Sequence, residues 1–120
     1  GGFYINPTIF EGVNNNMKIA KEEIFGPVLS VIDFENDEEA TTIANDTHYG
    51  LNAMIWSNNL NRVHKMAKNI KSGKVLVNSM SDGDMSVPHG GFKQSGFGRD
   101  KSLEAMQQYT QTKLTWIELK

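Results

Sequence analysis

Two glutamates stand just ahead of a Gly-Pro turn, in the run Glu22-Glu23-Ile24-Phe25-Gly26-Pro27. A carboxylate on such a turn can accept hydrogen bonds from two neighbouring hydroxyl groups, as on a ribose. The alternative is a solvated acidic turn with Phe25 inserted into the core, which is the commoner arrangement for residues of these types. The residues by themselves leave both interpretations open.

A glycine-rich cluster spans residues 88–99 and reads Pro-His-Gly-Gly-Phe-Lys-Gln-Ser-Gly-Phe-Gly-Arg. Its four glycines allow positive backbone dihedral angles and the close approach of a ligand or of another chain segment. A phosphate-binding loop is excluded because Gly-Lys-Ser/Thr at the required spacing is missing. The cluster is therefore either a ligand-binding loop or a structural loop held by tight turns.

The sequence predicts no metal site. Ser81-Asp82-Gly83-Asp84-Met85 has alternating aspartates, but it lacks the further acidic ligands and the terminal glutamate of a calcium loop. The three histidines (His48, His64 and His89) share no metal-ligand spacing, and we expect His64 to face solvent. Cysteine is absent from the 120 residues, which excludes disulfides and a cysteine nucleophile within this chain.

Composition places the chain among ordinary globular proteins. Its 120 residues predict one domain at most, and 38% are hydrophobic and 22% charged. A formal charge of −2 argues against a nucleic-acid partner. No apolar run approaches the ~18 residues that a membrane span needs. The first residues do not resemble a signal peptide, so we expect a cytoplasmic protein.

Strand and helix patterns alternate along the chain and must position these clusters. Three runs read as strands buried on both faces: Pro27–Phe34, Leu51–Trp56 and Lys74–Val77. A first helix is expected after Asn36, with Glu39 completing a capping box and Ala40, Ile43 and Ala44 facing inward. A second helix carries Leu60, Val63, Ala67 and Ile70 at helical spacing and should be ended by Ser72-Gly73.

The last third of the chain is dominated by a long loop from Asn78 to Arg99. Asp100 is expected to cap a final helix with Leu103, Met106 and Tyr109, and a strand should follow over Leu114–Leu119. This order predicts an α/β fold with a mainly parallel sheet and flanking helices. In such folds ligands bind beyond the carboxyl ends of the strands, here around Asn78 and the loop after it.

Taken together, the clusters resemble the C-terminal part of the aldehyde dehydrogenase superfamily. The strings that carry the resemblance, in the family's order, are Gly-Gly-Phe-Tyr-Ile-Asn-Pro-Thr-Ile-Phe, Lys-Glu-Glu-Ile-Phe-Gly-Pro-Val, Tyr-Gly-Leu-Asn-Ala, Lys-Val-Leu-Val-Asn-Ser and the glycine-rich cluster itself. Residues 81–88 and 98–103 look most like the branch that oxidises γ-glutamyl-aminobutyraldehyde and related ω-amino aldehydes.

The resemblance implies an enzyme that oxidises aldehydes to carboxylic acids with NAD or NADP. A cysteine thiolate attacks the aldehyde, a hydride leaves to the nicotinamide, and a glutamate base helps to hydrolyse the thioester. By the same resemblance Glu23 holds the nicotinamide ribose hydroxyls and Phe25 packs beside that ribose. The cysteine, the base and the Gly-rich cofactor turn of the family would lie upstream of Gly1, so no catalytic residue is expected here.

The resemblance also assigns a substrate tunnel and an assembly element. Residues 82–89 match the loop that lines the tunnel, with Asp82, Asp84 and His89 as its named members. His89 departs from the family pattern, which usually has an aromatic residue there. Residues 1–110 match the C-terminal part of the catalytic domain and residues 111–120 a strand that joins a neighbouring subunit, so a homo-oligomer is expected.

Two hypotheses follow for the chain as a whole. It starts at Gly1 without methionine and ends in an apolar run, which favours a fragment of a longer dehydrogenase, inactive alone and binding no cofactor alone. The alternative is a non-enzymatic assembly or binding module that uses the same scaffold to pair with itself or with a full-length subunit.

Overall fold

The computed structural model describes residues 2–81 and 83–120, so the predicted tunnel residue Asp82 lies outside the described residues. The helices and strands are, in chain order, β1 (Thr8–Phe10), α1 (Lys18–Lys21), β2 (Val28–Ser30), α2 (Asp37–Asn45), β3 (Tyr49–Gly50), β4 (Asn52–Ile55), α3 (Leu60–Asn69), β5 (Lys74–Val77), β6 (Phe92–Lys93) and the 3-10 helix η1 (Leu103–Tyr109).

The strands of the described residues pair two by two, and parallel pairing prevails. β1 pairs with β2 and β4 with β5, both in parallel, whereas the short strands β3 and β6 pair antiparallel. The predicted α/β class with mainly parallel strands is confirmed. The strand expected over Pro27–Phe34 is shorter, because β2 has only the three residues of β1 to pair with.

The best-packed part of the molecule is α3 lying against the β4–β5 pair. Ile55, Val63 and Ile70 are buried together, and Ala53, Met66, Ala67 and Val75 pack around them. The predicted apolar stripe of the second helix is therefore confirmed for its central and last members, whereas Leu60 at the start of α3 is exposed. His64, on the same helix, is exposed as predicted.

Side-chain caps begin both longer helices. The Asn36 side chain accepts a hydrogen bond from the Glu39 backbone N–H at 2.9 Å, as predicted, and the Glu39 carboxylate accepts one from the Glu35 backbone N–H at 2.7 Å. At α3 the Asn59 side chain plays the same role for the Arg62 N–H at 3.0 Å. Asparagine is among the best capping residues, so both starts are encoded locally.

Two helix predictions need correction. The inward stripe of α2 is not buried: Ala40 and Ile43 are half-buried and Ala44 is exposed. Gly73 does not act as the C-terminal glycine of α3, since the helix ends at Asn69. Instead Gly73 lets two backbones touch, because a Cβ there would lie 1.8 Å from the carbonyl oxygen of Gly90.

The C-terminal third also differs from the prediction. The loop after Asn78 contains β6, and the last helix is a 3-10 helix whose preceding residue is Ser102. Asp100 is not its cap, because the backbone of Asp100 pairs with that of His89 in an antiparallel bridge. Leu114–Leu119 has no strand partner among the described residues and runs as extended chain.

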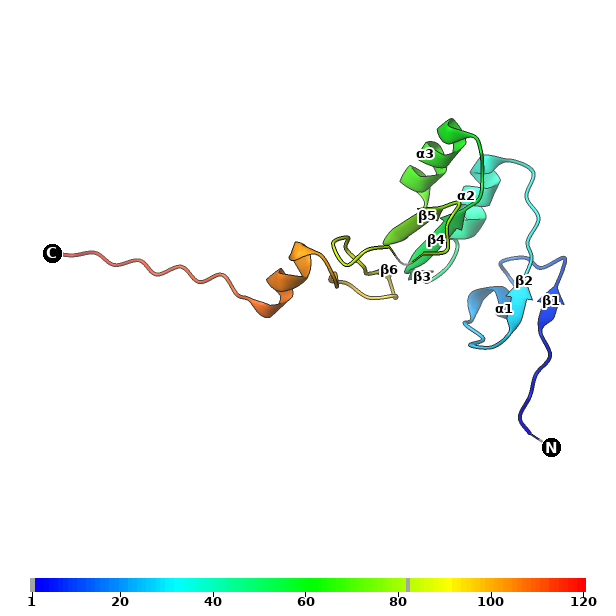
Figure 1. The fold of residues 1–120 in the computed structure, drawn as a ribbon, viewed down its shortest axis with the longest axis horizontal. Coiled ribbons are helices and arrows are strands. Elements are labelled where there is room, and N and C mark those ends of the chain that lie inside the picture. The colour runs from blue at the N-terminus through cyan, green and yellow to red at the C-terminus, as the bar shows by residue number, and fades with distance from the viewer. Residues whose placement is uncertain (1, 82) are drawn as a thin grey trace.

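The chain as a whole is elongated (Figure 1). The β1–α1–β2 lobe, the central unit around α2 and α3, and the C-terminal arm follow one another, and the two termini lie at opposite ends. The radius of gyration is 19.8 Å, against about 14 Å for a compact domain of this length. None of the helices in the described part of the chain is long and apolar enough to cross a membrane.

Candidate functional site

Glu23 and Phe25 line one hollow in the N-terminal lobe. The hollow holds about 470 Å³. Its walls come from α1, from β2 and from the turn between them: Ile19, Glu22, Glu23, Ile24, Phe25, Gly26, Val28 and Ser30. The two residues that the sequence assigned to one site do line the same hollow. Their role in holding a ribose stays a prediction.

Phe25 has an unusual backbone and an unburied ring. Its φ is +52°, in the left-handed region that residues with a side chain rarely adopt, and its side chain is 91% exposed. The alternative interpretation, in which Phe25 inserts into the core of this turn, is wrong for the chain as described. Strained residues of this kind gather at ligand sites, where the surrounding structure holds them.

Glu23, which lines the same hollow, is also exposed. A free carboxylate next to an unburied aromatic face and a hollow offers what a ribose needs, namely an acceptor for two hydroxyls and an apolar surface. These residues fit the ribose end of a nicotinamide cofactor.

The glycine-rich segment, residues 88–99, folds back onto the end of α2 and the strand after it. The Lys93 ammonium donates to the backbone oxygens of Asn45 and Thr47, at 2.8 and 3.0 Å. The Gln94 N–H donates to the His48 carbonyl at 2.9 Å, and the Ser95 hydroxyl accepts from the Gly50 N–H at 3.0 Å. The structural-loop interpretation of this cluster is therefore supported by every one of these contacts.

Within the same segment an arginine holds the loop closed. The Arg99 guanidinium donates to the carbonyls of Gly91 and Gly98, at 3.0 and 2.6 Å, and lies 5.4 Å from the centre of the Phe92 ring. A cation over an aromatic face at this distance is attractive. The loop is thus stabilised by contacts within itself as well as by its contacts with the end of α2.

The predicted tunnel residues Asp84 and His89 lie on a ribbon formed with the chain that leads into η1. His89 and Asp100 exchange two backbone hydrogen bonds of 2.8 and 2.7 Å, and the Ser102 N–H donates to the Met85 carbonyl at 2.9 Å. The Nδ1 atom of His89 is buried and has no hydrogen-bond partner within the described residues. Buried polar atoms normally have a partner, so the unpaired Nδ1 makes His89 an exception within this ribbon.

Asp84 is exposed and stays ionised. Hydrogen bonds from the backbone N–H and the hydroxyl of Ser86 lower the pKa of Asp84, and the positive charge of Lys101 lowers it further. The backbone N–H of Ser86 lies 2.8 Å from the carboxylate. This segment therefore carries a negative charge at neutral pH.

The structure does not bring the two predicted sites together. Glu23 and Phe25 belong to the β1–β2 lobe, whereas Asp84 and His89 follow β5 in the central part of the chain (Figure 1). Anything that contacts both must be held by additional protein surface.

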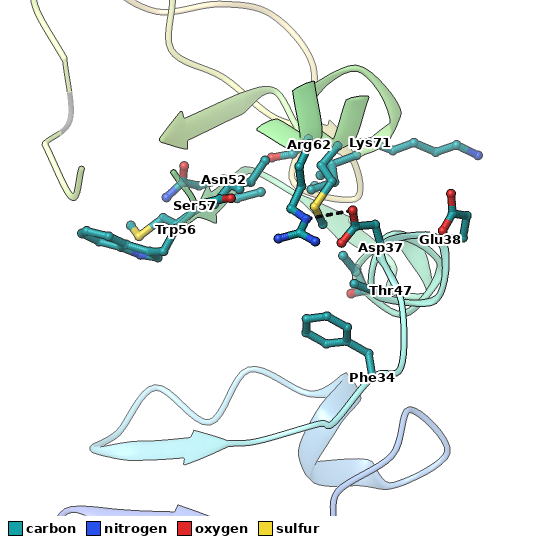
Figure 2. A pocket seen from close by; sticks show the side chains of 18 of the residues that line it. Phe34, Asp37, Glu38, Thr47, Asn52, Trp56, Ser57, Arg62 and Lys71 are labelled. Carbon is teal, nitrogen blue, oxygen red and sulfur yellow. Dashed lines mark hydrogen bonds and ion pairs between the residues drawn. The ribbon is translucent and has the colours of Figure 1, made fainter. Parts of the chain in front are cut away.

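A large hollow was missed by the sequence analysis. It holds about 1060 Å³ and lies between α2, β4 and the start of α3, with Phe34 at its lower side (Figure 2). Its apolar walls include Phe34, Ala40, Ala44, Met54, Trp56 and Met66, and Trp56 remains 63% exposed. The apolar run Leu51–Trp56 was a usable signal, because β4 pairs on one edge only within the described residues.

Charged side chains close one end of this large hollow. The Arg62 guanidinium donates to the Asp37 carboxylate at 2.8 Å, which joins α3 to α2 (Figure 2). A second ion pair joins Lys65, three residues after Arg62, to Glu38, the residue after Asp37. Asp37 is half-buried and the other three side chains are exposed, and the two pairs connect α2 with α3, so we assign them a structural role.

Comparison with known proteins decides the family. Residues 1–115 match the model of the aldehyde dehydrogenase family. The chain belongs to this family. The resemblance seen in the sequence strings is thereby confirmed over nearly the whole chain.

Two named relatives are similar to this chain over almost all of its length. The chain is 52% identical over 115 residues to the NADP/NAD-dependent aldehyde dehydrogenase PuuC of Escherichia coli, and 45% identical over 118 residues to the aminoacetaldehyde dehydrogenase of Pseudomonas aeruginosa. These alignments cover 96% and 98% of this chain. The chain spans 23% and 24% of the lengths of those two relatives.

A solved structure agrees closely with the fold. A mutant of the indole-3-acetaldehyde dehydrogenase AldA of P. syringae, solved with NAD+ and IAA, has a TM-score of 0.90 and 59% sequence identity to this chain. It is matched by 97% of this chain, which covers 23% of that protein. The elongated arrangement therefore recurs as one quarter of a larger dehydrogenase.

Proposed function

We propose that the chain works as the C-terminal part of an NAD(P)-dependent aldehyde dehydrogenase that oxidises ω-amino or γ-glutamylamino aldehydes to carboxylic acids in the cytoplasm. The longer protein implied by this proposal is called the complete dehydrogenase below. The family match over residues 1–115 carries the proposal. The 45% identity to a dehydrogenase named for aminoacetaldehyde supports the substrate class.

In this function Glu23 and Phe25 hold the ribose next to the nicotinamide. The Glu23 carboxylate accepts hydrogen bonds from both ribose hydroxyls, and the exposed Phe25 ring covers one side of the sugar. When bound, NAD or NADP supplies the hydride acceptor. The protein's part is orientation, since a reacting group about 1 Å out of place can cost ~100-fold in rate.

The segment with Asp84 and His89 contributes a wall of the aldehyde tunnel. The ionised Asp84 side chain is exposed and attracts a cationic or amide-rich tail toward the mouth of the tunnel. His89 adds a second polar side chain to this wall. Together these features favour amino aldehydes over purely apolar ones.

The bond-forming residues must come from the rest of the complete dehydrogenase. The overall reaction adds the hydroxyl of water to the aldehyde carbon, passes a hydride from that carbon to NAD or NADP and releases the remaining proton of water, and it needs an activated nucleophile such as a thiolate. No cysteine occurs in the 120 residues. We therefore propose that the isolated chain is inactive and binds no cofactor by itself.

A turnover assay tests the function. The complete dehydrogenase is given NAD or NADP with an ω-amino aldehyde, a γ-glutamylamino aldehyde or a neutral aliphatic aldehyde, and cofactor reduction is followed by absorbance. We expect oxidation with a preference for the first two aldehydes. No oxidation of any of them would contradict the proposal in favour of a non-enzymatic assembly module. Turnover by the isolated chain above contaminant level would contradict its predicted inactivity.

A further inference from the structure

Lys93 is placed unusually for a lysine in a glycine-rich loop. Its φ is +54°, in the left-handed region, although it carries a long side chain. Lys93 is exposed, yet its side chain reaches the end of α2, where its ammonium donates to the carbonyl oxygens of Asn45 and Thr47. A strained backbone therefore coincides with two charge-assisted hydrogen bonds.

The two acceptors belong to a helix end that needs such a partner. Asn45 is the last residue of α2, and the final carbonyls of a helix have no intrahelical donor. The C-terminal end of a helix also carries a partial negative charge, which a lysine ammonium stabilises. Lys93 therefore connects the glycine-rich segment to a site that is electrostatically matched to it.

Asn45 also links this end to α3, so the anchor point is rigid. Its side-chain amide donates to the Asn69 carbonyl at 2.9 Å and its side-chain oxygen accepts from the Lys71 N–H at 2.7 Å. The backbone oxygen of Asn45 accepts a hydrogen bond from the Lys93 ammonium at 2.8 Å. One asparagine thus joins α2, the end of α3 and the glycine-rich segment.

None of the other hydrogen bonds described above for this segment directs a charged group at α2. The contact of Ser95 with Gly50 and the backbone bond from Gln94 to His48 are neutral, and the Arg99 guanidinium donates to carbonyls of the loop itself. At its upstream end the segment begins with Pro88 and His89, and the chain before them leads directly to the Asp84 side of the predicted tunnel. The orientation of this upstream part depends on how firmly the segment is held.

We propose that Lys93 is a positioning residue for aldehyde binding: by holding the glycine-rich segment on the C-terminal end of α2, it fixes the wall that carries Asp84 and His89. The effect on the aldehyde rests on the proposed function of that wall. The anchoring itself rests only on the contacts above.

The test compares three variants of the complete dehydrogenase with the unaltered protein. Lys93→Met removes the ammonium and keeps a long side chain, and Lys93→Arg keeps a cation that can reach the same carbonyls. Lys68→Met removes an exposed lysine of α3 and serves as the matched control. The measurements are amide hydrogen exchange in residues 89–99, KM for an amino aldehyde, KM for NAD+ and kcat.

We expect Lys93→Met to remove both anchoring hydrogen bonds, to accelerate exchange in residues 89–99 and to raise KM for the aldehyde about fivefold. KM for NAD+ should stay unchanged, since Glu23 and Phe25 lie in the other lobe. Lys93→Arg should restore most of the aldehyde affinity, and Lys68→Met should match the unaltered protein.

Each other outcome overturns part of the inference. Unchanged exchange in Lys93→Met would show that the lysine anchors nothing. Faster exchange with an unchanged aldehyde KM would keep the anchor and refute its role in aldehyde binding. A parallel loss in kcat and in both KM values, not restored by Lys93→Arg, would indicate a merely structural residue. If the unaltered complete dehydrogenase oxidises no aldehyde, the proposed function fails, while the exchange comparison still decides the anchor.

Discussion

Single residues with left-handed backbone mark the parts of this chain where the family's chemistry is expected. Phe25 stands at the proposed ribose site, and Lys93 holds the glycine-rich segment. Asn78, with φ of +49°, directly follows β5, and its side chain bonds to both the N–H and the C=O of Ser57, at 2.9 and 3.0 Å. It ties the carboxyl ends of β4 and β5 together at the place where ligands are expected in parallel sheets.

Replacing Glu23, the proposed ribose acceptor, should weaken cofactor binding and leave aldehyde binding unchanged. In the complete dehydrogenase, Glu23→Gln weakens the hydrogen bonds to the ribose, so we expect a higher KM for NAD+ and a kcat reduced by up to ~100-fold. KM for the aldehyde should not change. Glu11→Gln is the matched control, because Glu11 is an exposed glutamate next to β1 and is not among the residues that line the hollow. Unchanged kcat and unchanged cofactor KM in Glu23→Gln would refute the assignment.

Removing the negative charges of the tunnel loop should change substrate preference. We expect the double variant Asp82→Asn with Asp84→Asn to lower the ratio of kcat/KM for an amino aldehyde to that for a neutral aldehyde about threefold, the size of a surface electrostatic effect. Asp33→Asn removes an exposed carboxylate of the other lobe and should leave the ratio unchanged. An unaltered ratio in the double variant would mean that the acidic loop takes no part in selection.

At the scale of elements, the sequence predicts features that depend on neighbouring residues and does not predict contacts between distant segments. The start of α2 and the α3 stripe were predictable, because a cap and a periodic apolar face are properties of neighbouring residues. The β3–β6 pair could not be predicted, since two-residue strands 42 positions apart leave no periodic pattern. Gly73 was assigned a role in its own helix, whereas its actual contact is with the backbone of Gly90.

Of the candidate sites, the one built from neighbouring residues was predictable from the sequence, and those built from distant segments were not. The Glu23–Phe25 hollow is local, so both members were named from one run of residues. The large hollow beside β4 was missed because its walls come from α2, β4 and α3 and exist only after these elements pack. The anchor made by Lys93 was missed for the same reason, because its acceptors lie more than 40 residues upstream.

The pair of helices α2 and α3 offers a test by pH. A hydrogen bond from Lys65, together with its charge, lowers the pKa of Glu38, and the same contact raises the pKa of Lys65. Because the carboxyl pKa is lower in the folded chain than in the unfolded one, the pair stabilises the fold above the ordinary glutamate pKa. That contribution is lost as the pH falls through the lowered value.

Titration of the Glu38 carboxyl carbon by NMR measures this shift directly. We expect Lys65→Met to return the pKa of Glu38 toward its ordinary value and Lys68→Met to leave it lowered. Since both partners are exposed, the effect on the free energy of unfolding should be small. A Glu38 pKa that is insensitive to Lys65→Met would show that the ion pair does not persist in solution.

On the scale of the whole molecule, the chain exposes surface that an isolated domain would bury. Strands expected to be buried on both faces are open: β4 lies beside the large hollow, and each pair of described strands has free edges. Exposed apolar patches of this extent are typical of surfaces that contact other protein. The same elements recur within a dehydrogenase about four times as long, as the 23% coverage shows. The open surface is consistent with a unit that is completed by further protein.

The last prediction concerns association, and the C-terminal arm decides it. Residues 111–120 run as extended chain away from the body (Figure 1) and carry four exposed apolar side chains, Leu114, Trp116, Ile117 and Leu119, with Trp116 84% exposed. Extended apolar chain with unpaired N–H and C=O groups adds readily to an open strand edge of another copy. We therefore expect the 120-residue chain to form a dimer or a higher oligomer through this arm.

Light scattering coupled to gel filtration at micromolar concentration measures the oligomer. Trp116→Asp places a charge in the middle of the apolar run and should shift the chain toward the monomer, because an unpaired charge is costly to bury in an interface. Gln111→Asp adds the same charge outside the run and should leave the oligomer intact. A species of 13.4 kDa that persists on dilution and on concentration of the unaltered chain would show that it closes its own surface. Equal effects of the two substitutions would show that association does not pass through the arm.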